Sequence, residues 1–326
     1  MPNTVPTLEL DAYLRLNRAS LGEWLVAIRE ISGCEDMACR LHRGSGPAGA
    51  LSALETGQGC ILCIYACQGM DITGCRGVDP VLLLPLAGEP EIALRDGRWQ
   101  PLAQLTFAHP EDRFHMRVPE SGRVMILRPK AGSLDNLATV NGGWQLSACQ
   151  QLIDCYLHRS PFFRDDNHAR LMTSELFCQL SRVAQEESIP VCDCSGLDRR
   201  LLRAVEKIRR EPDWDFNLRE LASHAGVSER NLYYLMKREA SITPYRLYQR
   251  NRLVRVRYRL VDCQCTVPHI SWYAADEGFS HLGRFAALYR EHFGELPSET
   301  VQWRRNLQTV EKEPSGPSFT FTELQN

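Results

Sequence analysis

Two short segments in the second half of the sequence bring together side chains that form directional hydrogen bonds. The first segment contains Arg230, Asn231, Tyr233 and Tyr234, and the second contains His281 and Arg284. Arginine pairs bidentately with guanine and asparagine with adenine, whereas tyrosine usually bonds to phosphate. These residue types therefore suit contact with duplex DNA, and Arg284 is the residue that we expect to read a base in the second segment.

A repeated pattern precedes the two segments, with its copies 52 positions apart. The first copy contains Leu218, Leu221, Ala222, Gly226, Val227 and Ser228, and the second contains Ile270, Tyr273, Ala274, Gly278, Phe279 and Ser280. Each copy has apolar residues at helical spacing, a small residue where helices can cross and a glycine that tolerates positive φ. The serine of each copy can cap the helix that follows. The pattern predicts two helix-turn-helix units, at about residues 218–239 and 270–293.

The second helix of each unit has an apolar side that should face inward. In the first unit this side contains Leu232, Leu235 and Met236, and in the second it contains Phe285 and Tyr289. We expect the polar residues named above to lie on the outer side, with the first turn of the helix nearest the bases.

A basic segment lies between the two units. Thr243 and Pro244 resemble an N-cap and a first helical residue, and the sequence continues to Leu260 without glycine or proline. Such a helix, about 25 Å long, can hold two units in major-groove segments about 34 Å apart. We expect some of its arginines to contact phosphate, with Arg252 and Arg255 as the selected candidates. The six arginines are Arg246, Arg250, Arg252, Arg255, Arg257 and Arg259.

Charge is distributed unevenly along the 326 residues, although the net charge is only −2. Residues 197–305 contain 20 basic and 14 acidic residues, a net charge of +6, which leaves −8 for the remainder. A chain of this length can form two domains, each with its own core. The charge distribution indicates an acidic domain joined to a basic one that meets a polyanion.

The N-terminal part has the pattern of a β-rich domain followed by helices. Between about Leu51 and Arg128, short β-type segments alternate with turns such as Asp96-Gly97 and Pro119–Gly122, which predicts a small barrel or sandwich. From about 146 to 185 the spacing becomes helical, through Leu171, Phe177, Leu180 and Val183. These helices could cover the sheet or pair with a second subunit, and the sequence does not choose between the two.

The fold class that follows is α+β, with a β-rich sensor domain and an all-α domain. We expect an effector-sensing and dimerisation domain at 1–190, a linker at 191–197, a DNA-binding domain at 198–305 and a disordered tail at 306–326. The sequence has neither a signal-peptide pattern nor an apolar run long enough to span a bilayer, so we expect a cytoplasmic protein without a membrane partner.

Thirteen cysteines raise the possibility of a zinc site. Cys60 and Cys63 lie in an apolar segment that resembles a buried strand, where positions three apart face opposite ways. The remaining close pairs, at 192/194 and 263/265, lack nearby histidine or cysteine partners, and the odd count argues against a disulfide framework. We therefore expect buried thiols, no metal, no cofactor and no catalytic site, with a redox-sensing thiol as the alternative.

The C-terminal residues resemble the DNA-binding domain of AraC/XylS-type transcription regulators, particularly the XylS-like branch. The resemblance rests on Leu221–Leu232, Ile242–Tyr245, Glu277–Phe285 and Phe293–Thr300. It implies a regulator, in most cases an activator, of a bacterial operon, with RNA polymerase as a partner and a homodimer as the assembly. It also implies base contacts at Arg230, Tyr234 and Arg284.

A fainter resemblance to the same branch lies in Leu41–Gly49 and implies a sensor for a small effector, for which an aromatic acid is one candidate. Arg40, His42 and Arg43 are the selected residues for an anionic ligand, and His109, Arg113 and His115 are further candidates. A different function remains open: some DNA-repair methyl-acceptors combine this type of DNA-binding unit with cysteine chemistry, and they need a four-thiolate zinc site.

Overall fold

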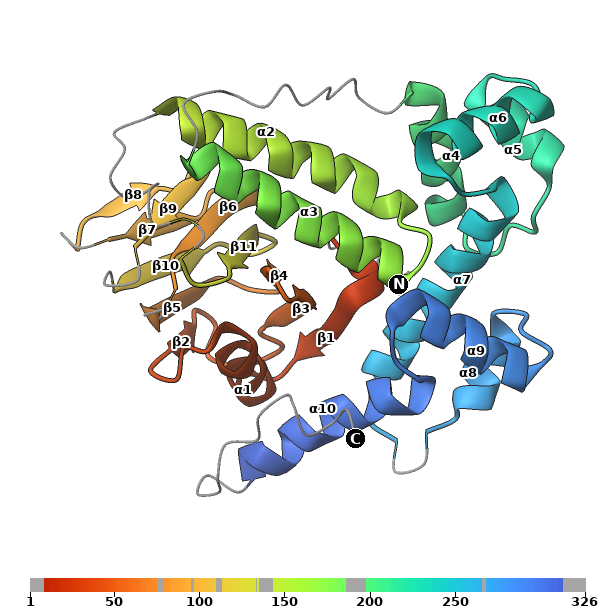
Figure 1. Ribbon diagram of the computed structural model, residues 1–326. Helices are drawn as coiled ribbons and strands as arrows, with labels where there is room; N and C mark the ends of the chain where they lie inside the picture. The colour runs from red at the N-terminus through yellow and green to blue at the C-terminus, as the bar shows by residue number, and fades with distance from the viewer. Residues whose placement is uncertain are drawn as a thin grey trace.

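The computed structural model describes residues 9–75, 79–94, 97–109, 113–132, 134, 143–185, 198–265 and 268–312, with side chains up to residue 307. The predicted linker at 191–197, Asp96 of the predicted hairpin turn and the predicted tail beyond residue 312 lie outside these residues. Two β-sheets form one half of the described structure, and a series of helices forms the other half (Figure 1).

The two sheets are antiparallel. The six-stranded sheet has the order β1-β3-β4-β11-β6-β9, and the five-stranded sheet has the order β2-β5-β10-β7-β8. The first contains β1 (Leu14–Ala19), β3 (Gly49–Thr56), β4 (Gly59–Ala66), β6 (Val81–Ala87), β9 (Thr106–Ala108) and β11 (Arg123–Pro129). The second contains β2 (Ala38–Leu41), β5 (Met70–Cys75), β7 (Glu91–Ala93), β8 (Trp99–Pro101) and β10 (Phe114–Val118).

The six-stranded sheet is buried on both faces. In β4, Leu62 and Ile64 belong to the core between the sheets, which α1 (Leu21–Ser32) closes with Trp24. Ile61 and Cys63 point the other way and pack against helices. Burial on both faces explains the continuous apolar sequence of β4, whereas β10 alternates between buried and half-buried residues because one face of its sheet meets solvent. The predicted β-rich sandwich is thereby confirmed.

Two long helices cover the sheet, which is the first of the alternatives that the sequence left open; pairing with a second subunit stays a prediction. α2 (Gly143–Arg159) and α3 (Asp166–Gln185) are joined through the short 3-10 helix η3 (Ser160–Phe162) and lie side by side (Figure 1). Phe177, Leu180 and Val183 are buried against the sheet, as predicted. The prediction for Leu171 is wrong: its exposed fraction is 64%, because at 3.6 residues per turn it lies opposite Leu180 on α3.

The C-terminal helices are α4 (Arg199–Arg210), α5 (Leu218–Ala225), α6 (Glu229–Ala240), α7 (Pro244–Val261), α8 (Ile270–Asp276), α9 (Leu282–Phe293) and α10 (Pro297–Lys312). The predicted start of a disordered tail at residue 306 is wrong, since α10 continues to Lys312. Trp303 and Leu307 of this helix are buried in the same core as α1. Within the described part of the chain, no helix is both long and apolar enough to cross a membrane.

The helical half and the sheet half share one hydrophobic core. Leu253 and Val256 of α7 pack in the same cluster as Leu14 of β1 and Leu54 of β3. The buried guanidinium of Arg257 donates from Nε to the backbone carbonyl of Leu14 over 3.1 Å. The predicted sensor and DNA-binding regions are therefore docked against each other along α7 and β1 (Figure 1).

Candidate functional site

The first helix-turn-helix unit consists of α5 and α6, supported by α4. Ala222 is buried where the helices cross, and Gly226 ends α5 with φ +77°, as the pattern predicted. The amide of Val227 donates to the carbonyl of Ala222 over 3.0 Å, a hydrogen bond that satisfies the end of the helix. Ser228 then caps α6 by accepting a hydrogen bond from the amide of Asn231.

The outer side of α6 carries every candidate that the sequence predicted for this unit. Leu232, Leu235 and Met236 are buried, whereas the polar candidates on the other side are exposed. These candidates are Arg230, Asn231, Tyr233 and Tyr234, with exposed fractions of 46% for Tyr233 and 59% for Tyr234. The guanidinium of Arg238 lies 5.6 Å from the Tyr234 ring centre, which restrains that ring.

The second unit repeats the backbone geometry of the first. Gly278 has φ +73°, and the amide of Phe279 donates to the carbonyl of Ala274 over 2.9 Å. Phe285 and Tyr289 of α9 are buried as predicted, while His281 and Arg284 are exposed. The two units therefore present the same kind of surface, one on α6 and the other on α9.

The prediction that Ser280 caps α9 is wrong. The N-cap of α9 is His281, and no side chain makes a capping hydrogen bond there. The turn of the second unit is one residue longer, so that the buried Phe285 corresponds to Leu232 with an offset of 53 rather than 52. By the same offset Arg284 occupies the helix position of Asn231, and Gly283 occupies that of Arg230.

An exposed apolar residue in the second unit was missed by the sequence reasoning. Leu282, the first residue of α9, is 49% exposed and lies two residues before Arg284. An apolar side chain at the start of a recognition helix can contact the methyl group of thymine. The sequence could have indicated that Leu282 is exposed, because Leu282 lies in the first turn of the helix.

The arginines of α7 differ most from expectation. Arg250 and Arg257 are buried, so these two of the six arginines are not available for phosphate, whereas contact by Arg252 and Arg255 stays a prediction. Arg255 forms an ion pair with Glu277 at 2.8 Å, and Arg259 forms one with Asp276 at 2.8 Å. These contacts attach α7 to the second unit.

The remaining two arginines of α7 also have partners within the fold. Arg252 lies 5.4 Å from the ring centre of Tyr248 and 5.6 Å from that of Phe279. Arg246 is 55% exposed at its side chain and stands 3.5 Å from Glu291. Except for Tyr248, which lies one turn before Arg252 on α7, these acidic and aromatic partners lie outside the helix, so its local charge pattern did not reveal them.

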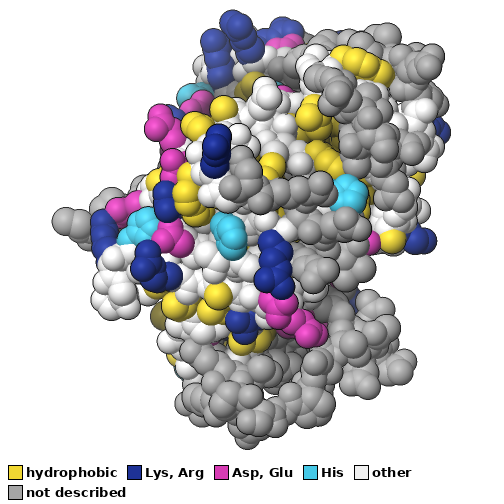
Figure 2. Space-filling model, turned by 90° about the vertical axis from the view of Figure 1, so that its left-hand side faces the viewer, with side chains coloured by type: hydrophobic (Ala, Val, Ile, Leu, Met, Phe, Trp, Pro, Cys, Tyr) yellow, Lys and Arg dark blue, Asp and Glu magenta, His cyan; other side chains and the backbone are white. Residues whose placement is uncertain are grey.

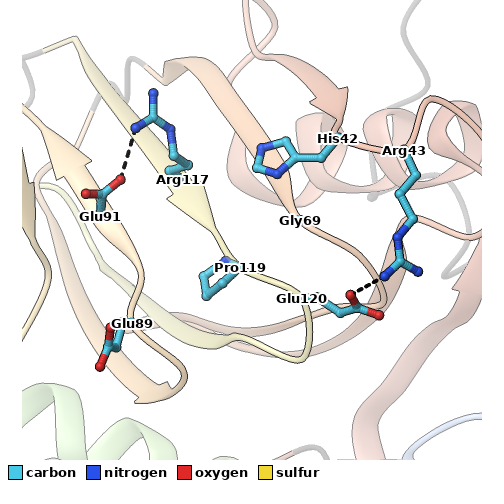
Figure 3. Close-up of a pocket in the computed structure, with 8 residues that line it drawn as sticks. All are labelled: His42, Arg43, Gly69, Glu89, Glu91, Arg117, Pro119 and Glu120. Carbon is cyan, nitrogen blue, oxygen red and sulfur yellow. Dashed lines mark hydrogen bonds and ion pairs between the residues drawn. The ribbon is translucent and has the colours of Figure 1, made fainter.

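Only part of the predicted effector set lines a pocket on the outer sheet (Figure 3). His42 and Arg43 line a cavity of about 370 Å³ together with Arg117 and three glutamates. Arg40 is not among the lining residues, and its side chain is 83% exposed. The lining glutamates are Glu89, Glu91 and Glu120.

The basic groups around this pocket are paired with carboxylates. Arg43 meets Glu120 at 2.5 Å, and both Arg40 and His42 contact Asp71. Although partial burial acts in the opposite direction, the hydrogen bonds from His42 and Arg40 hold the pKa of Asp71 below its usual value. Side chains of both charges intermingle on this side of the molecule (Figure 2). The arrangement therefore does not single out an anionic ligand.

The described cysteines form no cluster that could hold a metal ion, and Cys178 and Cys265 are the exposed free thiols among them. Cys60 faces the core between the sheets and Cys63 faces the helices, as the strand argument predicted. Burial raises the pKa of Cys60 and of Cys149 to about 12, so neither supplies a thiolate near neutral pH. Among the described residues no group of three or more metal-ligating side chains occurs. Cys155, in contrast to the expectation of thiols alone, is disulfide-bonded.

Comparison with known proteins bears on the helical half. Residues 221–302 match the family described as "Helix-turn-helix domain". The XylDLEGF operon transcriptional activator 1 of Pseudomonas putida is 38% identical over 115 residues, which cover 35% of this chain and 34% of that protein. The XylDLEGF operon transcriptional activator 2 of Pseudomonas putida is 34% identical over 119 residues, which cover 36% of this chain and 75% of that protein.

A solved structure shows the same kind of similarity. The probable AraC family transcriptional regulator from Rhodopseudomonas palustris is 30% identical, and the alignment covers 32% of this chain and 96% of that one, with a TM-score of 0.30. The fold and the comparisons define a protein with two helix-turn-helix units of the kind that contacts DNA. The chain belongs to the AraC/XylS family of transcriptional regulators. Its match spans about a third of the length of the first curated relative.

Proposed function

We propose that this chain is a sequence-specific DNA-binding transcription activator of a bacterial operon. In this proposal α6 and α9 enter successive major-groove segments of one duplex, with Arg230, Asn231 and Arg284 as base-reading residues. Tyr233 and His281 contact the backbone at the edges of the two sites, and Tyr234 contacts a base, as the resemblance implies. Arg252 and Arg255 contribute to phosphate contact only where their guanidinium groups can leave Phe279 and Glu277.

One observation carries the proposal. The two units end their first helices with the same backbone hydrogen bond, from Val227 to Ala222 and from Phe279 to Ala274, after a glycine of positive φ. Each unit then buries the apolar side of its second helix and leaves the polar side exposed. A duplicated unit with two outward-facing polar helices fits two half-sites, whereas the described residues contain no cluster of the kind that the four-thiolate zinc site of a methyl-acceptor needs.

The sheet half has the role of a sensor in this proposal. It responds to a small organic effector, for which an aromatic acid is one candidate, and transmits the response through its contacts with α7 and α10. We further propose that the chain acts as a homodimer, in the cytoplasm, and that it recruits RNA polymerase.

The test is recovery of genomic DNA fragments bound by the full-length protein, followed by a reporter assay on the recovered promoters. The proposal predicts enrichment of a shared bipartite sequence and a rise in reporter output when the protein is expressed. The matched variant is Arg230→Ala, with Arg210→Ala as a control, because Arg210 is an exposed arginine of α4 outside the recognition helices. Recovery of fragments with no common sequence would contradict the proposal.

A further inference from the structure

The recognition helices α6 and α9 differ in the size of their exposed side chains. Three exposed positions that hold an arginine and two tyrosines on α6 hold a glycine and two alanines on α9. With the offset of 53 between the two helices, these residues of α9 are Gly283, Ala286 and Ala287. The second unit therefore cannot read bases with side chains at the positions that the first unit uses.

Only two side chains near the start of α9 are able to reach a base. The first turns of a recognition helix lie nearest the bases. In the first six residues of α9, Leu282–Ala287, Phe285 is buried. Among these six, Leu282 and Arg284 alone are exposed and have a side chain longer than that of alanine. Arg284 reads a base in the proposed function, which leaves Leu282 without an assigned role.

Leu282 lies at an open end of the helix. A single exposed leucine is common on protein surfaces, so its 49% exposure matters only because of where the residue lies. The Cα–Cβ bonds of a helix tilt toward its N-terminus, so the side chain of the first residue projects beyond the helix end. The N-cap His281 makes no capping hydrogen bond there. Leu282 thus presents an apolar group at the end of α9 that meets the bases.

Gly283 provides independent evidence for a close contact at this place. An added Cβ would meet no atom within 4 Å, and Gly283 is not among the glycines of positive φ. Neither packing nor backbone conformation in the described structure therefore requires a glycine, although alanine is more favourable in a helix. Glycine allows another molecule to approach the backbone closely.

The charges around Leu282 suit DNA. The first turn of α9 contains no acidic residue, whereas that of α6 contains Glu229. Arg284 is exposed and forms no hydrogen bond or ion pair with any described residue. In the major groove, guanine presents two acceptors to an arginine, and thymine presents its 5-methyl group to an apolar side chain. Leu282 and Arg284 together match these two kinds of base.

We propose that Leu282 reads a thymine in the second half-site through contact with its 5-methyl group. Arg284 reads a guanine of the same half-site, and Gly283 between them lets the helix backbone lie close to the bases. This inference rests on the proposed function, because it requires α9 to enter a major groove. The two half-sites consequently differ in sequence, since the first is read mainly by hydrogen-bonding side chains and the second partly by a methyl contact.

The experiment replaces thymine by deoxyuridine, which keeps every hydrogen-bonding group and lacks only the 5-methyl group. In a promoter fragment recovered with the full-length protein, each thymine of the half-site that Arg284→Ala affects is replaced in turn. Fluorescence anisotropy gives the Kd of the wild type and of Leu282→Ala for each fragment. We expect one replacement to raise the Kd of the wild type about threefold to fourfold, as for the burial of one methyl group, and to leave that of Leu282→Ala unchanged.

The matched control is Leu171→Ala, because Leu171 is an exposed leucine of α3, outside the helical half. This variant should keep the wild-type ratio between the Kd values for the deoxyuridine and thymine fragments. Urea unfolding checks that each variant folds. The proposal is overturned if no replacement weakens binding of the wild type, or if Leu282→Ala responds to the missing methyl group as strongly as the wild type does.

A larger side chain at residue 283 tests the close approach of α9. Gly283→Leu should leave urea unfolding unchanged, because the space around the added side chain is open, and should weaken binding to the specific fragment about tenfold. Gly57→Leu is the control, since an added Cβ at Gly57, in the turn between β3 and β4, also meets no atom within 4 Å. Equal binding by the two variants would overturn the proposed position of Gly283 against the bases.

Binding of the unmodified fragment separates this proposal from the proposed function. A chain that prefers the fragment over scrambled competitor, but responds to none of the deoxyuridine replacements, retains the proposed function and loses the methyl contact. A chain without that preference loses both.

Discussion

Glu23 and Arg304 form an ion pair in which each side chain is only 4% exposed, with 2.9 Å between Oε1 and Nε. Glu23 lies in α1 of the sheet half, and Arg304 lies in α10 after the second helix-turn-helix unit. Arg304 also donates to the carbonyl of Val261 at the end of α7 over 2.8 Å. One buried guanidinium thus connects the sheet half, the long helix and the C-terminal helix.

The first prediction concerns this pair. Glu23→Gln removes the nearer counter-ion of the buried Arg304 and leaves only Asp262, at 3.5 Å, which should lower the free energy of unfolding by up to about 3–5 kcal/mol. Urea denaturation measures the effect. The double variant Glu23→Leu with Arg304→Met should recover part of the loss, because it removes both charges together. The control is Glu206→Gln, which breaks an exposed pair with Arg210 and should cost less than about 1 kcal/mol. Equal losses in Glu23→Gln and Glu206→Gln would show that the buried pair does not stabilise the docked halves.

The second prediction concerns base reading by α9. Arg284→Ala should weaken specific DNA binding by about 1–3 kcal/mol and relax the preference at one base pair. Arg290 is an exposed arginine in the last turn of the same helix, so Arg290→Ala is the matched control. Competition binding against a set of single-base variants of the site measures both effects. If Arg284→Ala reduced binding equally on specific and random DNA, Arg284 would contact the backbone rather than a base.

The third prediction compares the two turn glycines. Gly226→Ala places a side chain at φ +77° with open space around it, since the nearest atom is 3.7 Å from the added Cβ, and should cost about 1–2 kcal/mol. Gly278→Ala has the same conformational cost, and its Cβ would also overlap the Arg252 guanidinium. That guanidinium would have to leave Tyr248 and Phe279. Thermal unfolding should therefore show Gly278→Ala as the less stable variant; the reverse order would mean that the Arg252 contacts contribute nothing.

The fourth prediction concerns pH. Burial, reinforced by Arg250 and Arg246, lowers the pKa of His292 to about 4. The unfolded chain binds a proton at His292 near pH 6.5 while the folded chain stays neutral, so stability falls as the pH drops from about 6.5 to 4. His292 contributes a slope of up to about 1.4 kcal/mol per pH unit in this range. His292→Phe should reduce the slope of the unfolding free energy between pH 6.5 and 4 by that amount, and an unchanged slope would mean that His292 titrates normally.

The sequence was sufficient for features that depend on neighbouring residues. Helical spacing placed Leu232, Leu235 and Met236 on the buried side of α6, and the glycine and serine of the first unit take the predicted positive φ and N-cap. The same reasoning placed Cys60 and Cys63 on opposite faces of a strand. In each case the feature depends on residues only a few positions apart in the sequence. Periodicity determines which face of the helix or strand a residue occupies, and the capping residue determines where the helix begins.

Features that depend on distant partners were not predictable in this way. Arg257 of α7 meets Glu295, and Arg304 of α10 meets Glu23, so two basic residues that look like surface charges in the sequence are buried structural charges. The one-residue extension before α9 shifted the N-cap from Ser280 to His281, because the burial of Phe285 and Tyr289 fixes where that helix begins. The cavity of about 240 Å³ that Tyr13, Arg209 and Arg250 line exists only because elements far apart in sequence pack together.

Hydroxyl-radical footprinting of the full-length protein on a recovered promoter fragment tests whether α6 and α9 enter successive major-groove segments of one duplex. We expect two protected segments about 34 Å apart along one face of the duplex, one for each unit. Arg230→Ala should weaken protection of one segment and Arg284→Ala that of the other. A single protected segment that both variants affect equally would contradict the presence of two DNA-contacting units. Protection that a scrambled competitor abolishes as readily as the specific fragment does would contradict sequence-specific binding.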